Sequence, residues 1–159
     1  MTKPYITIKH IIVEIVGYVL TLMAFIVAIV GAITIEGPIV TNYGSSGEPT
    51  GYGSVASLFL PPAMNLATLV LLSLLSHFGK DSYYHFRHPV RPEKKMIALS
   101  DSVMMVFVIS LIISLYGLVM TIMLAVQNGT GVFVATIAMS VLVLVAIIIM
   151  SIKLEKDIK

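Results

Sequence analysis

The sequence predicts an all-α membrane protein with four transmembrane helices, both termini in the cytoplasm and a structured outer loop between the first two helices. Three observations support this fold class. The 159-residue chain is 58% hydrophobic and only 11% charged, whereas an average protein carries about 25% charged residues. Its apolar residues form four runs, each long enough for a membrane helix, which needs about 20 residues. Its cations flank these runs, which favours contact with lipid headgroups over nucleic acid.

The first apolar run extends from about residue 11 to 35 and is interrupted only by Glu14. It is long enough to cross a bilayer with some tilt. Lys9 precedes it, and Val30-Gly31-Ala32 resembles a signal-peptide cleavage site. The apolar region of a signal peptide, however, spans only about 7–15 residues. We therefore expect an uncleaved signal anchor.

The second apolar run covers residues 55–78 and contains Pro61 and Pro62. Ser54 precedes the run and is a residue type favoured at helix N-caps. Because proline lacks a backbone N–H, it is tolerated in the first turn of a helix but not in its interior. We expect a short interfacial segment over residues 55–60 and a membrane helix that begins near Pro61.

A basic loop over residues 79–95 precedes the third helix, which is predicted at about 98–126. Pro89 and Pro92 disfavour a continuous helix through the loop. Asp101 is expected in the first turn of the third helix, where a carboxylate suits the positive end of the helix dipole.

The fourth helix is predicted at about 131–152 and completes a single domain over residues 1–159. The turn before it, residues 127–130, is expected to place Gly129 at a positive φ. The uninterrupted apolar run at 141–150 suggests that this helix faces lipid.

The positions of the cations predict the orientation. All ten Lys and Arg residues lie in the N-terminal tail, in the 79–95 loop or in the C-terminal tail. With four spans, these three segments lie on one side of the membrane, which the positive-inside rule identifies as the cytoplasm. We expect a multi-pass cell-membrane protein with residues 42–54 outside.

Small residues predict which helices pack together, because they let helix backbones approach closely in lipid. They recur at three- or four-residue spacing on one face of the first helix and one face of the third. The two sets are Gly17, Thr21, Ala24, Ala28 and Gly31, and Ser110, Ser114, Gly117, Thr121 and Ala125. We expect these faces to meet.

Two polar side chains are predicted inside the membrane, Glu14 and Asn65. A carboxylate there is costly and suggests function by default. The alternative is an interfacial Glu14 that Lys9, His10 or the basic loop neutralises. Asn65 is expected to hydrogen-bond to the third helix; a substrate contact is the alternative.

The sequence contains no recognisable catalytic or metal-binding motif, and it has no cysteine. His77, His85 and His88 have spacings that are poor for zinc, and ordinary interfacial histidines are the simpler interpretation. We predict no catalytic residue, no metal, no cofactor and no enzymatic activity.

The segment 42–54 is the only long polar stretch without Lys or Arg. Its four glycines allow tight turns and Pro49 stiffens it. A structured loop with exposed tyrosine and glutamate side chains is typical of a recognition surface. The candidate partner-binding residues are Asn42, Tyr43, Glu48 and Tyr52.

Three segments of the chain, 39–43, 47–54 and 58–62, together with His88-Pro89-Val90, resemble a known family. This family is the uncharacterised four-helix membrane domain found at the N-terminus of Sdp-type toxin-immunity proteins, and the resemblance covers about residues 11–95. Asn42, Gly44 and Thr50 depart from its pattern, which commonly has His, Asn and an acid there. The resemblance implies a bacterial or archaeal cell-membrane protein. Some relatives confer immunity to a secreted peptide toxin and signal to a repressor, but they carry additional helices.

Two functions are therefore weighed from the sequence. The first is recognition of a peptide, lipid or protein partner through the outer loop, with an immunity-like or envelope-signalling role as a specific version. The alternative is a small transporter or channel subunit with a polar path through Glu14, Asn65 and the third helix. An intramembrane enzyme has the least support. Membrane lipids are expected contacts, nucleic acid is not, and the small-residue faces also allow a homodimer.

Overall fold

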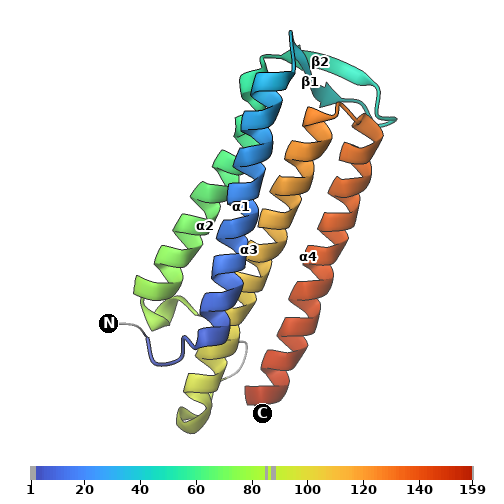
Figure 1. Ribbon diagram of the computed structural model, residues 1–159. Helices are drawn as coiled ribbons and strands as arrows, with labels where there is room; N and C mark the ends of the chain where they lie inside the picture. Colours follow the sequence, from blue (N-terminus) through green and yellow to red (C-terminus); the bar gives the residue numbers. More distant parts are fainter. Residues whose placement is uncertain (1–2, 85, 87–88, 159) are drawn as a thin grey trace.

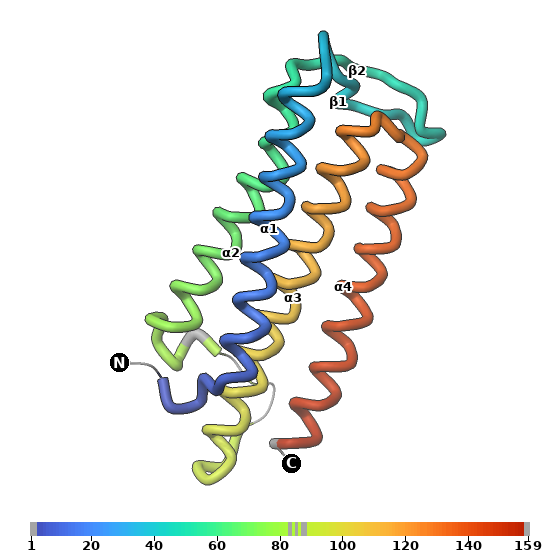
Figure 2. The backbone as a smooth tube through the Cα atoms, in the orientation of Figure 1, coloured from blue at the N-terminus to red at the C-terminus, as the bar shows by residue number. Residues whose placement is uncertain are grey.

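The computed structural model describes residues 3–84, 86 and 89–158, which form four long helices side by side with a small β-hairpin at one end (Figure 1). All four helices are long and apolar enough to cross a membrane. This confirms the prediction of a helical, multi-pass membrane protein. The first turn of α1 and the last turn of α4 lie at the end opposite the hairpin (Figure 2).

Helix α1 spans Ile8–Thr34, three residues earlier at its start than predicted. The earlier start has a local cause, because the backbone N–H of Thr7 donates to Nδ1 of His10 at 3.0 Å. This bond satisfies a backbone group that would be left unpaired at a helix N-terminus. The predicted small-residue face of α1 is buried along its whole length, from Gly17 to Gly31.

The loop after α1 is a β-hairpin, with β1 at Ile39–Tyr43 and β2 at Pro49–Gly53 paired antiparallel. The sequence analysis predicted a structured loop here but no strands. The turn between the strands is closed by backbone hydrogen bonds from Gly44 to Glu48 and from Gly47 to Gly44, at 2.8 and 3.0 Å. Gly47 has a φ of +86°, which glycine adopts without strain.

A short 3-10 helix at Val55–Phe59 leads into α2, which spans Leu60–Phe78. The hydroxyl of Ser54 accepts a hydrogen bond from the backbone N–H of Ala56 at 3.3 Å, as expected of an N-cap. Pro61 and Pro62 occupy the first turn of α2, where their missing N–H groups cost nothing. The long helix therefore begins close to Pro61, as the sequence analysis expected.

Helix α3 spans Lys95–Ala125 and follows two short 3-10 turns at Asp81–Tyr83 and Pro92–Lys94. The sequence analysis placed Asp101 in the first turn of this helix, and that was wrong. Because α3 begins at Lys95, its first turn contains no acidic residue and Asp101 lies in the second turn.

Helix α4 spans Gly129–Ile158. The expectation that Gly129 adopts a positive φ was also wrong, because Gln127 takes that conformation, with a φ of 52°. The side-chain oxygen of Asn128 accepts from the backbone N–H of Gly131 at 2.8 Å and so caps α4. Gly129 is needed for a different reason, a close backbone approach described below.

Helix α3 is the centre of the bundle, because α1, α2 and α4 all pack against it. The two predicted small-residue faces meet. A methyl group on Gly17 would lie 3.5 Å from Oγ of Ser114, and one on Gly31 would lie 3.7 Å from Cβ of Ala125. Helix α4 packs on α3 alone among the major helix contacts, and its apolar stretch contains no buried residue. It therefore presents most of its surface to lipid, as predicted.

Candidate functional site

The hairpin is held firmly on the helix ends by its first strand. Ile39 and Val40 are 0% and 4% exposed, and Ile39 packs in a cluster with Ala28 of α1 and with Leu58. Burial of such apolar side chains stabilises the folded state by about 25 cal/mol for each Å² of apolar surface removed from water. The start of the first strand is thus fixed to the bundle.

The tip of the hairpin reaches across to the start of α4 (Figure 1). A methyl group on Gly47 would lie 2.8 Å from the backbone nitrogen of Thr130, and one on Gly129 would lie under 3.0 Å from both the Gly47 carbonyl oxygen and the Tyr43 ring. Such distances are shorter than real Cβ contacts. The junction therefore requires glycine at Gly129, where the sequence analysis expected only a turn.

Tyr43, one of the predicted partner-binding residues, faces this junction. Its ring contacts Gly129, and its hydroxyl is buried with no hydrogen-bond partner among the described residues. Burial raises the pKa of the Tyr43 hydroxyl. Tyr43 therefore anchors the hairpin to α4 and is not available on its outer surface.

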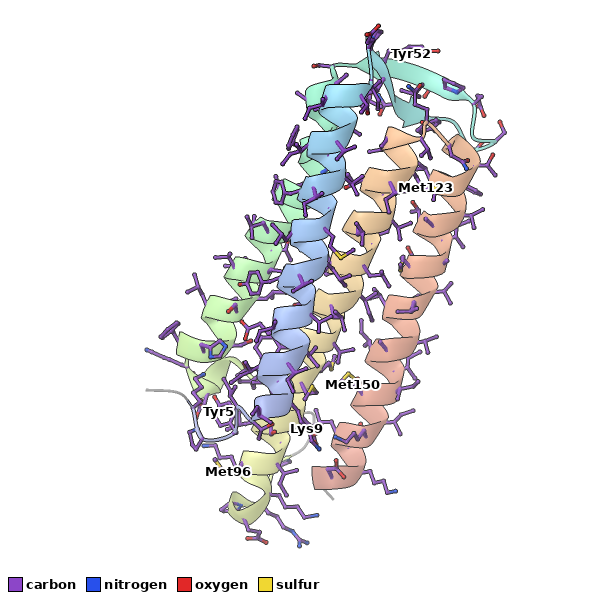
Figure 3. All side chains as sticks on the ribbon, in the orientation of Figure 1. Tyr5, Lys9, Tyr52, Met96, Met123 and Met150 are labelled. Carbon is purple, nitrogen blue, oxygen red and sulfur yellow. The ribbon has the colours of Figure 1, made fainter. Side chains whose placement is uncertain are left out.

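The other three predicted residues, Asn42, Glu48 and Tyr52, are exposed. Tyr52 is 68% exposed and lies at the hairpin end of the molecule (Figure 3). The carboxylate of Glu48 accepts a hydrogen bond from the hydroxyl of Ser46, and this bond lowers the pKa of Glu48. The hairpin thus presents an aromatic ring and an ordered carboxylate to the solvent.

Glu14 on α1 is paired within the bundle. Its Oε1 accepts a hydrogen bond from the hydroxyl of Ser73, and its Oε2 lies 3.0 Å from Nε2 of His77. The side chains of Glu14 and His77 are 12% and 20% exposed, and the His77 ring lies 5.9 Å from that of Phe107 on α3. Both partners found for Glu14 among the described residues come from α2, and neither is Lys9 or His10.

This arrangement connects α1 to α2 but does not assemble a nucleophile. In a serine hydrolase, the histidine contacts the serine hydroxyl and the carboxylate supports the histidine. Here the carboxylate lies between Ser73 and His77, so the hydroxyl is bound as a donor and is not activated.

Asn65 on α2 is 5% exposed and donates from Nδ2 to the carbonyl oxygen of Ser114 at 3.3 Å. This is the hydrogen bond between helices that the sequence analysis expected. Gly117 leaves the space for it, because a methyl group there would lie under 3.0 Å from the Asn65 amide.

His10 was weighed in the sequence analysis only as a neutralising partner for Glu14. It is 2% exposed, and its Nε2 lies 2.8 Å from the carbonyl oxygen of Ser100. Since Nδ1 accepts from the backbone N–H of Thr7, the proton is on Nε2 and the ring is neutral. The position of His10 in the sequence, immediately before the apolar run of the first helix, does not predict its contact with Ser100 on α3.

A polar pocket of about 370 Å³ lies beside His10, at the bundle end opposite the hairpin. Lys9, Asp101 and Lys153 are among its lining residues. The ammonium of Lys153 on α4 donates to Oδ1 of Asp101 on α3 at 2.6 Å, while Asp101 Oδ2 is buried without a partner among the described residues. Asp101 thus links α3 to α4, a role that the sequence analysis did not assign to it.

The N-terminal segment is tied to the loop after α2. The hydroxyl of Tyr5 donates to Oδ1 of Asp81 at 2.6 Å, and Lys3 lies 3.6 Å from the same oxygen. Burial and the Asp81 carboxylate both raise the pKa of Tyr5. The described residues before α1, from Lys3 onward, are therefore part of the folded structure.

Within the residues that the structure describes, no three His, Cys, Asp or Glu side chains are grouped so that they could hold a metal ion. Two histidines that the sequence analysis considered, His85 and His88, lie outside the described residues.

Comparisons with protein-family models, with curated proteins and with solved structures found no match. The resemblance to the Sdp-type membrane domain therefore stays a prediction from the sequence.

Proposed function

We propose that this protein is a non-enzymatic membrane protein that recognises a peptide or protein partner through its hairpin. The observation that carries the proposal is the difference in exposure within the hairpin. Ile39 and Val40 are buried and Tyr43 packs at the junction with α4, whereas Glu48 and Tyr52 stand in solvent. Pre-organised loops on a rigid scaffold are typical binding elements.

A tyrosine in the exposed position of Tyr52 suits partner binding. Tyrosine is enriched at interface hot spots because it combines a large apolar ring with a polar hydroxyl and loses little side-chain entropy. Glu48 adds a carboxylate whose orientation Ser46 fixes. A partner with an apolar pocket and a nearby cation would match this pair.

The orientation proposed for the protein places the hairpin outside the cytoplasm. All ten cations of the sequence lie in the tails or in the 79–95 loop, and the positive-inside rule assigns those segments to the cytoplasm. A partner would therefore meet the hairpin at the outer face of a bacterial or archaeal cell membrane. Immunity to a secreted peptide, or envelope signalling, is the specific version that the sequence resemblance implies.

The alternative, a transporter or channel subunit, has less support from the geometry. A polar path would have to connect Glu14 with Asn65. On α2, Leu69 lies between Asn65 and Ser73 at four-residue spacing and is 4% exposed. Glu14 and Asn65 are also already hydrogen-bonded to neighbouring helices. An apolar barrier between two satisfied polar groups favours recognition over transport.

The test is capture of the partner from the native membrane with a tyrosine-to-alanine variant as the probe. Wild type, Tyr52→Ala, Glu48→Ala and the control Glu36→Ala are extracted in mild detergent and compared by native mass spectrometry. Glu36 is a matched control because it is an exposed carboxylate at the same end but outside the hairpin. We expect a bound peptide or protein in wild type and Glu36→Ala that is depleted at least tenfold in the two hairpin variants.

A partner that stays bound in all four samples would show that the hairpin is not the recognition surface. A partner lost in all variants, including Glu36→Ala, would point to a general loss of structure at this end. Proton or solute flux into liposomes that Glu14→Gln abolishes would favour the transporter instead.

A further inference from the structure

The polar pocket between α1, α3 and α4 is lined by two lysines and an aspartate. The proposed binding of a partner by the hairpin does not involve these residues. The pocket lies where the apolar stretches of two lipid-facing helices end. Lys9 comes just before the apolar run that starts at Ile11, and Lys153 directly follows Ile152. Figure 3 shows Lys9 at this end of α1. In a bilayer, the phosphate groups of lipids lie at this boundary between apolar and polar segments.

One cation of the pocket lining, Lys9, has no carboxylate partner among the described residues. The other cation, Lys153, is paired with Asp101 at 2.6 Å and with Asp157, which does not line the pocket, at 3.9 Å. His10, which also lines the pocket, is neutral because its Nδ1 accepts a hydrogen bond. A phosphodiester would supply the anion that Lys9 lacks.

The two lysines differ in how they are held, and both can donate to a phosphate. Asp101 fixes the ammonium of Lys153 at 2.6 Å, yet the Lys153 side chain is 57% exposed. An ammonium group has three N–H donors, so donors remain for a ligand. Lys9 is exposed and makes no ion pair among the described residues.

The surroundings of the pocket suit a lipid better than a free anion. Ile8 and Met104 supply apolar walls, and Ile8 is 73% exposed. Both α1 and α4 carry exposed apolar side chains near this end, among them Ile12 and Ile149. An acyl chain can lie along such side chains while the phosphate remains between the lysines.

We propose that this pocket binds the headgroup of an anionic glycerophospholipid, with its phosphate between Lys9 and Lys153. Basic pockets between membrane helices are a known means of binding anionic lipid headgroups. The bound lipid adds a link between α1 and α4, whose main helix contact in the described structure is with α3.

The experiment uses the full chain in detergent with equimolar phosphatidylglycerol and phosphatidylcholine of identical acyl chains. Native mass spectrometry measures how much of each lipid remains bound to wild type, Lys9→Gln, Lys153→Gln and Lys156→Gln. Lys156 is the matched control, since it is an exposed lysine one turn along α4 that does not line the pocket. Lys9→Gln tests the pocket without breaking the Asp101–Lys153 pair.

We expect wild type and Lys156→Gln to retain phosphatidylglycerol in preference to phosphatidylcholine. Lys9→Gln and Lys153→Gln should each weaken phosphatidylglycerol binding about fivefold, the effect of one lysine near a membrane surface. Equal retention in Lys9→Gln and Lys156→Gln would overturn the proposal, and so would equal retention of the two lipids by wild type. Displacement of the lipid by millimolar inorganic phosphate would show that the site recognises a free anion instead.

Discussion

The amide of Asn65 on α2 occupies the space that the missing side chain of Gly117 leaves on α3. The amide then reaches the Ser114 carbonyl oxygen at 3.3 Å. Two residues 52 positions apart, on different helices, thus form one packing unit.

Gly117→Ala should therefore destabilise the bundle by about 1–3 kcal/mol, the usual cost of overpacking. The added methyl group would displace the Asn65 amide and break its hydrogen bond to Ser114. Unfolding in mixed detergent micelles measures the loss. The same substitution in an Asn65→Ala background provides the control, where we expect a much smaller loss. Equal losses in the two backgrounds would show that the two residues are not coupled.

The Glu14–His77 pair should couple α1 to α2 energetically. Glu14→Leu leaves Ser73 and His77 without their acceptor, and His77→Phe leaves the carboxylate without one of its partners. We expect a coupling free energy of about 0.5–2 kcal/mol from a double-mutant cycle, in the range found for hydrogen bonds between membrane helices. Additive effects of the two substitutions would contradict this coupling.

Gly129→Ala should detach the hairpin tip from α4 without disturbing the membrane helices. The added methyl group would collide with the Gly47 carbonyl oxygen and the Tyr43 ring. We expect faster amide hydrogen exchange across Ile39–Gly53 and unchanged exchange in α1–α3. Gln127→Gly is the control, because it relieves a positive φ in the same turn and adds no atoms. Unchanged exchange in the hairpin would show that the junction tolerates a methyl group.

Glu48 should make the hairpin sensitive to acid. Its folded-state pKa lies below its ordinary value, chiefly because Ser46 donates a hydrogen bond to it. A group with a lowered pKa adds stability above its ordinary pKa, and this stability is lost as the pH falls through the folded-state pKa. We expect hairpin amide protection to decrease below about pH 4, and Ser46→Ala to raise the pKa of Glu48 toward its ordinary value in a carboxylate NMR titration. A pKa that is unchanged in Ser46→Ala would assign the shift to another cause.

The sequence predicted the elements whose signal is local and repeated. Four apolar runs identified the four helices, and the spacing from Gly17 to Gly31 identified the face that α1 buries on α3. The strands were missed because β2 has two glycines and a proline in five residues, a composition that is depleted in strands.

The contacts between segments that are distant in the sequence could not be predicted from local patterns. The partner of Glu14 depends on how α2 is rotated about its axis, which determines that Ser73 and His77 face α1. Gly129 was interpreted through its own backbone freedom, whereas its role depends on Tyr43, a residue far away in the sequence. Asp101 was likewise assigned to a helix start, and its actual partner lies on the last helix.

Helix α4 makes a contact near each of its ends. Its 30 residues extend about 45 Å. The hairpin tip touches its first turn, and Asp101 holds Lys153 close to its other end. The junction with the hairpin and the Asp101–Lys153 pair therefore act on the same helix, which packs against α3 between them.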